Sequence, residues 1–172
     1  MASEWFGIYS WVTTLLWSLM DILPPILRRA IFHLILKKYG GKGYIDYRTY
    51  MRYPSRMLIG TETWINRGCR FLASYHHQDV EIRIGDYVSI APECIFLAAG
   101  HDYHDRTLPD TAATITVGDY AWIGARTTVL PGVSIGEGAV IGANSVVSHD
   151  IPPWSVAVGS PARVIKERTL TE

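Results

Sequence analysis

The sequence predicts an all-β solenoid of six-residue repeats that is preceded by an apolar helical segment. Two observations predict it: aliphatic residues recur every six positions in the C-terminal part of the chain, and residues 5–20 contain no charged side chain. The length of 172 residues suggests one domain with an appendage, and a hydrophobic fraction of 48% is too high for a disordered chain. Basic and acidic residues both number 16, so the chain lacks the basic excess that is typical of nucleic-acid binding.

Residues 1–41 form the apolar segment, which we expect to be helical and membrane-associated. Asp21 and Pro24-Pro25 interrupt it, and Gly40-Gly41 ends it. Residues 5–27 just reach the roughly 20 apolar residues that a membrane span needs, but the interruption favours a broken hairpin that lies in one leaflet. No basic stretch precedes the apolar run, so a cleaved signal peptide is not expected. The alternative is a hydrophobic helix pair that packs on the domain or on its oligomer partners.

Charge and polarity support the membrane interpretation. Residues 1–56 carry eight basic and three acidic side chains, whereas residues 57–172 carry eight and thirteen. Tryptophans of the segment would lie at headgroup level and its cations would face anionic lipid. Residues 42–56, which are rich in Tyr and Arg, are interpreted as a connector. A narrow polar stripe at helical spacing suits a half-immersed helix, and its members are Ser10, Thr13, Thr14, Ser18 and Asp21.

The repeat domain is expected over residues 57–168, with a short tail at 169–172. An aliphatic residue occurs every six positions at Val117, Ile123, Val129, Ile135, Ile141 and Val147. Glycine follows four of these residues, at Gly118, Gly124, Gly136 and Gly142. A small or aliphatic residue lies four positions after each one, at Ala121, Thr127, Val133, Ala139, Ser145 and Ile151. The same spacing occurs earlier, at Ile84, Ile90 and Phe96 and at Ile59, Ile65 and Phe71.

A period of six excludes a helix, because successive aliphatic residues would spiral around its axis. Short strands joined by tight turns fit this period, and three units make a triangular coil of about 18 residues, with coils stacked at about 4.8 Å. Glycine after the aliphatic residue is expected to give the corner its unusual backbone angles. Cys69 and Cys94 fall at the small inward position, so we expect core residues and not nucleophiles. Two cysteines do not make a disulfide framework and favour a reducing compartment.

The repeat is interrupted twice, at residues 72–81 and at 97–115, and the second loop is the candidate catalytic loop. Loops on a rigid scaffold are where sites are built. This loop contains His101 after Gly100, and histidine is the side chain whose charge changes nearest neutral pH. A side chain of this kind can take a proton from a reacting group and return it. His101 is therefore the candidate base, and either Asp102 or Glu93 is expected to orient its ring.

Several motifs of the repeat domain resemble the hexapeptide-repeat acyltransferases. They include Trp122-Ile-Gly-Ala125-Arg, Leu130-Pro-Gly132, Asp150-Ile-Pro-Pro-Trp154 and Gly159-Ser-Pro-Ala-Arg163-Val-Ile-Lys166. The resemblance covers residues 57–168 and is strongest to maltose and galactoside O-acetyltransferases and to bacterial surface-polysaccharide O-acetyltransferases. It implies a left-handed parallel β-helix, an exception to the usual right-handed crossover. It also implies a homotrimer that binds acetyl-CoA between neighbouring subunits and needs no metal.

The resemblance also assigns roles by matched position. His101 matches the catalytic histidine, and Asn66 aligns with an acceptor-binding asparagine. The predicted cofactor-binding residues are Trp122, Ala125, Ala143, Ser148, His149, Arg163 and Lys166. The family usually has Thr-Lys where this chain has Ser148-His149, and a neutral His at this place would weaken a charge contact to the cofactor. Asp102, Tyr103 and Arg106 are further candidates for the acceptor site.

The leading hypothesis is an acetyl-CoA-dependent O-acetyltransferase with a sugar hydroxyl as acceptor. The apolar N-terminus adds the expectation of a lipid-linked or surface glycan at the cytoplasmic face of the membrane. An alternative in the same class is N-acetylation of an amino sugar. From other classes, a γ-carbonic-anhydrase-like zinc enzyme would use three histidines from among His76, His77, His101 and His104, and a scaffold without catalysis would need no cofactor.

Overall fold

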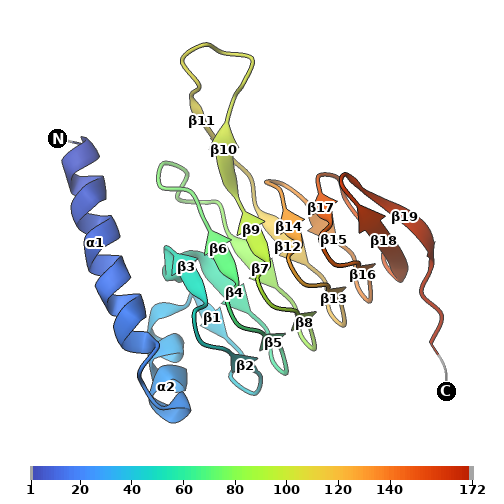
Figure 1. The fold of residues 1–172 in the computed structure, drawn as a ribbon, viewed down its shortest axis with the longest axis horizontal. Coiled ribbons are helices and arrows are strands. Elements are labelled where there is room, and N and C mark those ends of the chain that lie inside the picture. Colours follow the sequence, from blue (N-terminus) through green and yellow to red (C-terminus); the bar gives the residue numbers. More distant parts are fainter. Residues whose placement is uncertain (1, 171–172) are drawn as a thin grey trace.

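The computed structural model describes residues 2–170, with side chains from residue 7 onward. The side chain of Trp5 and the last two residues of the expected tail lie outside this description. The chain begins with helices α1 (Ala2–Met20) and α2 (Pro25–Ile35), followed by strands and one 3₁₀ turn at Pro54–Arg56. Both helices lie at the N-terminal end of the stacked strands, and the C-terminus lies at the other end (Figure 1).

Three parallel sheets make up most of the fold, and the chain visits them in rotation (Figure 1). Sheet A contains β1 (Lys38–Tyr39), β4 (Met57–Ile59), β7 (Ile82–Ile84), β12 (Ile115–Val117) and β15 (Ser134–Ile135). Sheet B contains β2 (Tyr44–Ile45), β5 (Trp64–Ile65), β8 (Ser89–Ile90), β13 (Trp122–Ile123), β16 (Val140–Ile141), β18 (Ser155–Gly159) and the antiparallel β19 (Ala162–Glu167). Sheet C contains β3 (Tyr50–Arg52), β6 (Arg70–Leu72), β9 (Ile95–Leu97), β14 (Thr128–Val129) and β17 (Val146–Val147). We call one visit to each sheet a circuit, and we name the turns AB, BC and CA after the sheets that they join.

The six-residue pattern predicts the core correctly. All six aliphatic positions from Val117 to Val147 are buried, and so are all six positions that lie four residues later. Pairing keeps the pattern in register, because Ile123 lies between Ile90 and Ile141 in sheet B. Cys69 and Cys94 are buried free thiols, and the contact with Cys94 together with burial raises the pKa of the Cys69 thiol. A core role for both is confirmed.

Glycine was expected at these turns because of unusual backbone angles, and this reason is wrong. Gly118 is not among the positive-φ residues; instead, a Cβ atom built on it would lie 2.6 Å from the backbone nitrogen of Glu137 in the next circuit. Glycine is needed at this position because two backbones approach closely. After Gly118 and Gly124 the left-handed residue comes two positions later and carries a side chain, at Tyr120 (φ 58°) and Arg126 (φ 59°). Each donates its N–H to a carbonyl of an earlier circuit, at Asp86 and Pro92, which holds the strained conformation.

The segment expected to be a connector, 42–56, contributes two strands to the sheets. Tyr44 of β2 pairs with Trp64, and Tyr50 of β3 pairs with Arg70, both in parallel register. Together with β1 these strands form the first circuit, so the sheets begin earlier than the repeat pattern indicates. Tyr and Arg at the outward positions conceal the six-residue period here, while Ile45 and Met51 keep it on the buried face.

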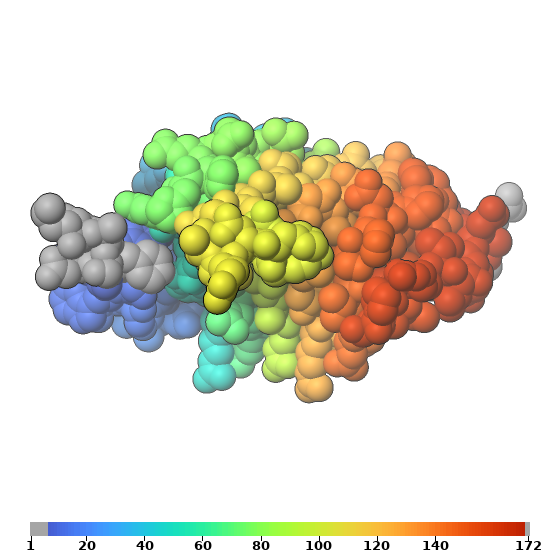
Figure 2. Space-filling model, turned by 90° about the horizontal axis from the view of Figure 1, so that it is seen from above, coloured from blue at the N-terminus to red at the C-terminus, as the bar shows by residue number. Residues whose placement is uncertain are grey.

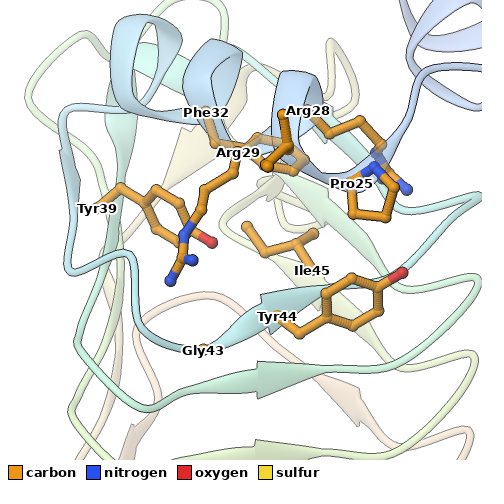
Figure 3. A pocket seen from close by; sticks show the side chains of 9 residues that line it. Pro25, Arg28, Arg29, Phe32, Tyr39, Gly43, Tyr44 and Ile45 are labelled. Atoms are coloured by element: carbon orange, nitrogen blue, oxygen red, sulfur yellow. The ribbon is translucent and has the colours of Figure 1, made fainter.

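Helix α2 closes the N-terminal end of the sheets. Phe32 is buried and packs edge-on against Tyr39, and the guanidinium of Arg28 lies 3.9 Å from the ring centroid of Tyr47. Arg28 and Arg29 also line a small pocket of about 130 Å³ between α2 and strands β1 and β2 (Figure 3). Within the described part of the chain, neither helix has both the length and the hydropathy that a bilayer crossing requires.

Candidate active site

Both interruptions of the repeat occur at CA turns, in two successive circuits. The first is the loop at residues 73–81. The second contains an antiparallel hairpin of β10 (Ala99–His101) and β11 (Asp110–Ala112), which projects from the body of the stacked strands (Figure 1). Viewed from above, the loop and the hairpin lie side by side (Figure 2). A hollow of about 430 Å³ between them is lined by residues of both loops and by Arg52 of β3.

His101 is the last residue of β10, directly across the hairpin from Asp110. Its Nδ1 lies 2.9 Å from the backbone oxygen of Leu108. A carbonyl oxygen only accepts hydrogen bonds, so Nδ1 carries the proton and Nε2 presents a lone pair. This is the tautomer that a general base needs, and the half-exposed ring borders the hollow.

Asp110 contacts histidines of both loops. Its Oδ1 lies 3.4 Å from His101 Nδ1, and its Oδ2 lies 2.9 Å from His76 Nε2. The Nε2 atom of His77 lies 3.3 Å from the backbone oxygen of Asp110. The hollow therefore contains one carboxylate between two imidazoles.

The expectation that Asp102 or Glu93 orients the ring of His101 is wrong. Asp102 Oδ1 accepts the backbone N–H of His104 at 2.9 Å, and Glu93 pairs with Arg126 at 2.9 Å. Leu108 and Asp110 occupy the Nδ1 side of the ring instead. A backbone carbonyl has no signal in the sequence, and Asp110 could have been found only by pairing His101 with the far end of its own loop.

The predicted acceptor residues do not come together in one chain. Tyr103 and Arg106 are exposed near the tip of the hairpin, next to Asp102. Asn66 lies in a BC turn, where its Nδ2 donates to the carbonyl of Ile90 at 2.9 Å. Asn66 and His101 thus lie in different stacks of turns.

The predicted cofactor residues are also distributed over several sides of the molecule. Ala125 and Ala143 lie in BC turns of successive circuits, where the N–H of Asn144 donates to the carbonyl of Ala125 at 2.8 Å. Trp122 is 52% exposed on the outer face of sheet B.

The remaining predicted cofactor residues lie elsewhere. Ser148 and His149 lie in a CA turn, with Oγ and Nδ1 2.9 Å apart. Arg163 and Lys166 are exposed on β19, and Arg163 donates through Nη1 to the carbonyl of Ala162 at 2.9 Å. Only Ser148 and His149 therefore share a stack of turns with His101.

The histidines of the zinc alternative, whose three ligands would meet at a subunit interface, make other contacts within the chain. In the part of the chain that the structure describes, no group of three or more His, Cys, Asp or Glu side chains has an arrangement that could hold a metal ion. Of the four candidate histidines, His76 and His101 contact the Asp110 carboxylate and His77 contacts its carbonyl, while His104 packs on Tyr103.

Known proteins share both the repeat and the fold of this chain. Residues 114–149 match the family described as bacterial transferase hexapeptide (six repeats). The galactoside O-acetyltransferase of Escherichia coli K12 is 34% identical over 143 residues, which cover 81% of this chain and 68% of that enzyme. The crystal structure of a maltose O-acetyltransferase from Clostridium difficile 630 superposes with a TM-score of 0.83 at 31% identity, covering 92% of this chain and 86% of the other.

A further solved structure contains a donor molecule. It is a hexapeptide-repeat-containing acetyltransferase from Vibrio cholerae in complex with acetyl coenzyme A, with a TM-score of 0.82 and 28% identity, covering 91% of this chain and 85% of that one. The repeat, the three parallel sheets and these relatives together define the class: the chain belongs to the hexapeptide-repeat transferase family. Within it, the chain is an acyltransferase that groups with the galactoside and maltose O-acetyltransferases.

Proposed function

We propose that this acetyl-CoA-dependent O-acetyltransferase uses His101 as general base to acetylate a sugar hydroxyl. One observation carries the proposal: Nδ1 of His101 is 2.9 Å from the Leu108 carbonyl, so Nε2 is the basic atom beside a hollow of about 430 Å³. His101 Nε2 takes the hydroxyl proton while the acceptor oxygen attacks the thioester carbonyl. The C–S bond then breaks, the acetyl ester remains on the sugar, and the thiolate of CoA leaves with the proton that His101 returns.

The backbone N–H of Ala125 is proposed to stabilise the oxyanion that forms during transfer, with Trp122 covering the thioester end of the donor. Ala143, through its backbone, and Ser148 and His149 are proposed to make further contacts to the cofactor. Arg163 and Lys166 bind the nucleotide phosphates, because both are exposed cations on one strand and phosphate oxygens accept strong charge-assisted hydrogen bonds. Asn66, Asp102, Tyr103 and Arg106 are proposed to contact the acceptor.

Acetyl transfer to a panel of free and lipid-linked glycans tests the catalytic role. His101→Ala is expected to lower kcat by about 10²- to 10⁴-fold, the usual contribution of a general base. Acetyl-CoA binding by this variant is expected to stay at the wild-type level. A variant that binds acetyl-CoA and transfers at the wild-type rate would show that His101 is not the base.

Donor binding is tested separately, by thermal shift. A ligand that binds only the folded state adds about 2.7 kcal/mol at one hundred times its Kd. Arg163→Ala/Lys166→Ala is expected to lose most of this stabilisation, whereas Lys42→Ala, an exposed cation at the opposite end of the chain, is expected to keep it. Equal stabilisation of both variants by acetyl-CoA would contradict the phosphate assignment.

We also propose that the coil is left-handed and that the protein is a homotrimer with its active sites between subunits. Membership of the hexapeptide-repeat family supports the left-handed coil. The distribution of the site supports the trimer, because His101 lies in a CA turn while Trp122 lies on sheet B and Ala125 in a BC turn. A neighbouring subunit is needed to bring these residues to one donor molecule. Sedimentation equilibrium is expected to give three times the chain mass of 19.3 kDa, and a monomer with full activity would contradict the shared site.

Residues 1–41, which α2 and β1 join to the sheets, are proposed to act as a monotopic membrane-binding segment at the cytoplasmic face, which would bring the enzyme to a lipid-linked or surface glycan. Hydrophobic side chains of α1, α2 and their connection are exposed, with Ile22 and Ile26 each 78% exposed. The hydroxyl groups of α1 donate to its own carbonyls, as Thr14 does to Ser10 at 2.7 Å and Ser18 to Thr14 at 2.9 Å. Because these hydroxyl groups are already hydrogen-bonded within the helix, the free energy needed to place them against hydrocarbon is lower.

Vesicle co-sedimentation tests the membrane contact. Ile22→Glu/Ile26→Glu is expected to abolish binding to vesicles that contain anionic phospholipid, because two charges would enter the acyl boundary. Leu170→Glu is the matched control, since this exposed leucine lies at the opposite end of the chain. Undiminished binding of the double variant, with the helices still folded by circular dichroism, would contradict the membrane role.

A further inference from the structure

We propose that His76 and Asp110 position His101, with the Asp110 carboxylate shared between two histidines. This inference rests on the proposed function, because it assigns how the base of that reaction is held. Residues 82–96 separate the two interruptions of the repeat in the chain, and the interruptions meet at this one carboxylate. Asp110 thus joins the loop at residues 73–81 to the catalytic hairpin.

The two oxygens of the Asp110 carboxylate contact different histidines. Nε2 of His76 lies 2.9 Å from Oδ2, a close contact between the imidazole and the carboxylate that links the two loops. Nδ1 of His101 lies 3.4 Å from Oδ1 but 2.9 Å from the Leu108 carbonyl. The carbonyl therefore takes the hydrogen bond that fixes the tautomer, and Asp110 contributes a negative charge beside the ring.

The negative charge of Asp110 acts in the step in which His101 takes the proton. When His101 accepts the hydroxyl proton, its ring becomes a cation, and the neighbouring carboxylate stabilises this cation more than it stabilises the neutral ring. Asp110 thus lowers the energy of the transition state and has little effect on the ground state. A positioning residue of this kind is expected to change kcat more than KM.

His76 acts through Asp110. The Asp110 side chain is 42% exposed, so without a partner its carboxylate would rotate and be hydrated. The contact with His76 holds one oxygen, and the edge-on contact of His76 with Tyr75 at 4.8 Å holds the imidazole in turn. Nε2 of His77, at 3.3 Å from the Asp110 carbonyl, is a second link between the loop and β11.

A double-mutant cycle on the full-length protein tests this arrangement. Asp110→Asn is expected to lower kcat by about tenfold, less than loss of the base itself, and to leave the acceptor KM and the Kd for acetyl-CoA unchanged. His76→Gln is expected to lower kcat by about threefold, and the double variant is expected to equal Asp110→Asn, because the histidine has nothing left to orient. His104→Gln, whose ring packs on Tyr103, is the matched control and keeps the wild-type kcat.

The outcomes separate this inference from the proposed function. A wild-type kcat for Asp110→Asn, or losses that multiply in the double variant, would overturn the positioning role while His101→Ala still abolishes transfer. Absence of transfer by the wild-type enzyme to every acceptor would overturn the proposed function instead. Unchanged acetyl-CoA affinity in all variants shows that each one is folded.

Discussion

Single residues in the turns determine how closely successive circuits stack. Gly118 faces the backbone of Glu137, whereas Gly7 in α1 has no heavy atom within 4 Å of the position that a Cβ would take. The two glycines therefore make a matched pair: one is required by close approach, and the other only lowers helix propensity.

Alanine substitution distinguishes the two. Gly118→Ala is expected to destabilise the fold by about 2 kcal/mol or more, because the backbone of the next circuit has to move. Gly7→Ala is expected to be neutral or to stabilise by about 0.5–1 kcal/mol, since alanine favours the helix. Urea unfolding measures both, and similar free energies of unfolding for the two variants would contradict the close-approach argument.

The sequence predicts the residues of the core well and the residues around the base poorly. The buried positions follow from a period of six, because each depends only on its own place in the repeat. His101 is marked by its position at a break in that period. Asp110 and Leu108 are not marked, because their contacts depend on the register of a hairpin and on a second loop from the previous circuit.

At the scale of elements, one buried carboxylate ties the segment after α2 to the sheets. The side chain of Glu81 is 9% exposed and forms ion pairs with Lys37 and with Arg83, the latter at 2.7 Å. The hydrogen bond from Lys37, and then that from Arg83, holds the pKa of Glu81 below its usual value despite the burial. A carboxylate with a depressed pKa stabilises the fold above its unfolded pKa, and this stabilisation is lost as the pH falls through the lower, folded value.

Glu81→Gln is expected to cost about 1 kcal/mol at pH 7, because both cations are half-exposed and water screens the pairs. The difference in unfolding free energy between this variant and the wild type is expected to shrink below about pH 4, as the wild-type carboxylate becomes protonated. Chemical unfolding of both proteins at pH 7, 5 and 3 measures this difference. A difference that grows as the pH falls would contradict the ion-pair assignment.

The β10–β11 hairpin is an element that serves the site and not the core. Its two strands pair only with each other, and the residues at its tip are exposed. We expect that replacing residues 102–109 by Asn-Gly, the two-residue turn that hairpins favour, leaves the thermal midpoint nearly unchanged. Acetyl transfer is expected to be lost while acetyl-CoA still binds, because the replacement removes the Leu108 carbonyl and the proposed acceptor contacts of Asp102, Tyr103 and Arg106. Retained transfer would show that the base is held, and the acceptor bound, from elsewhere.

At the scale of the whole molecule, the separation of His101 from Trp122 leads to a complementation test. His101→Ala and Trp122→Ala are each expected to be nearly inactive as pure proteins. If each site combines one residue from each of two neighbours, random mixed trimers restore about a quarter of the sites. Co-refolding at equal amounts and assay of specific activity measures this, and a mixture as inactive as its parents would locate the whole site in one chain.

The way in which the two ends of the stack are covered has a consequence for any shortened version of the chain. At one end, β19 folds back on β18, and at the other, α2 closes the first circuit through the Arg28–Tyr47 contact and a hydrogen bond from Tyr47 Oη to the Leu23 carbonyl at 3.0 Å. Removing residues 1–37 would expose β1, β2 and β3 as unpaired parallel edges, which are templates for end-to-end polymerisation. We therefore expect the helices to prevent end-to-end polymerisation of the sheets.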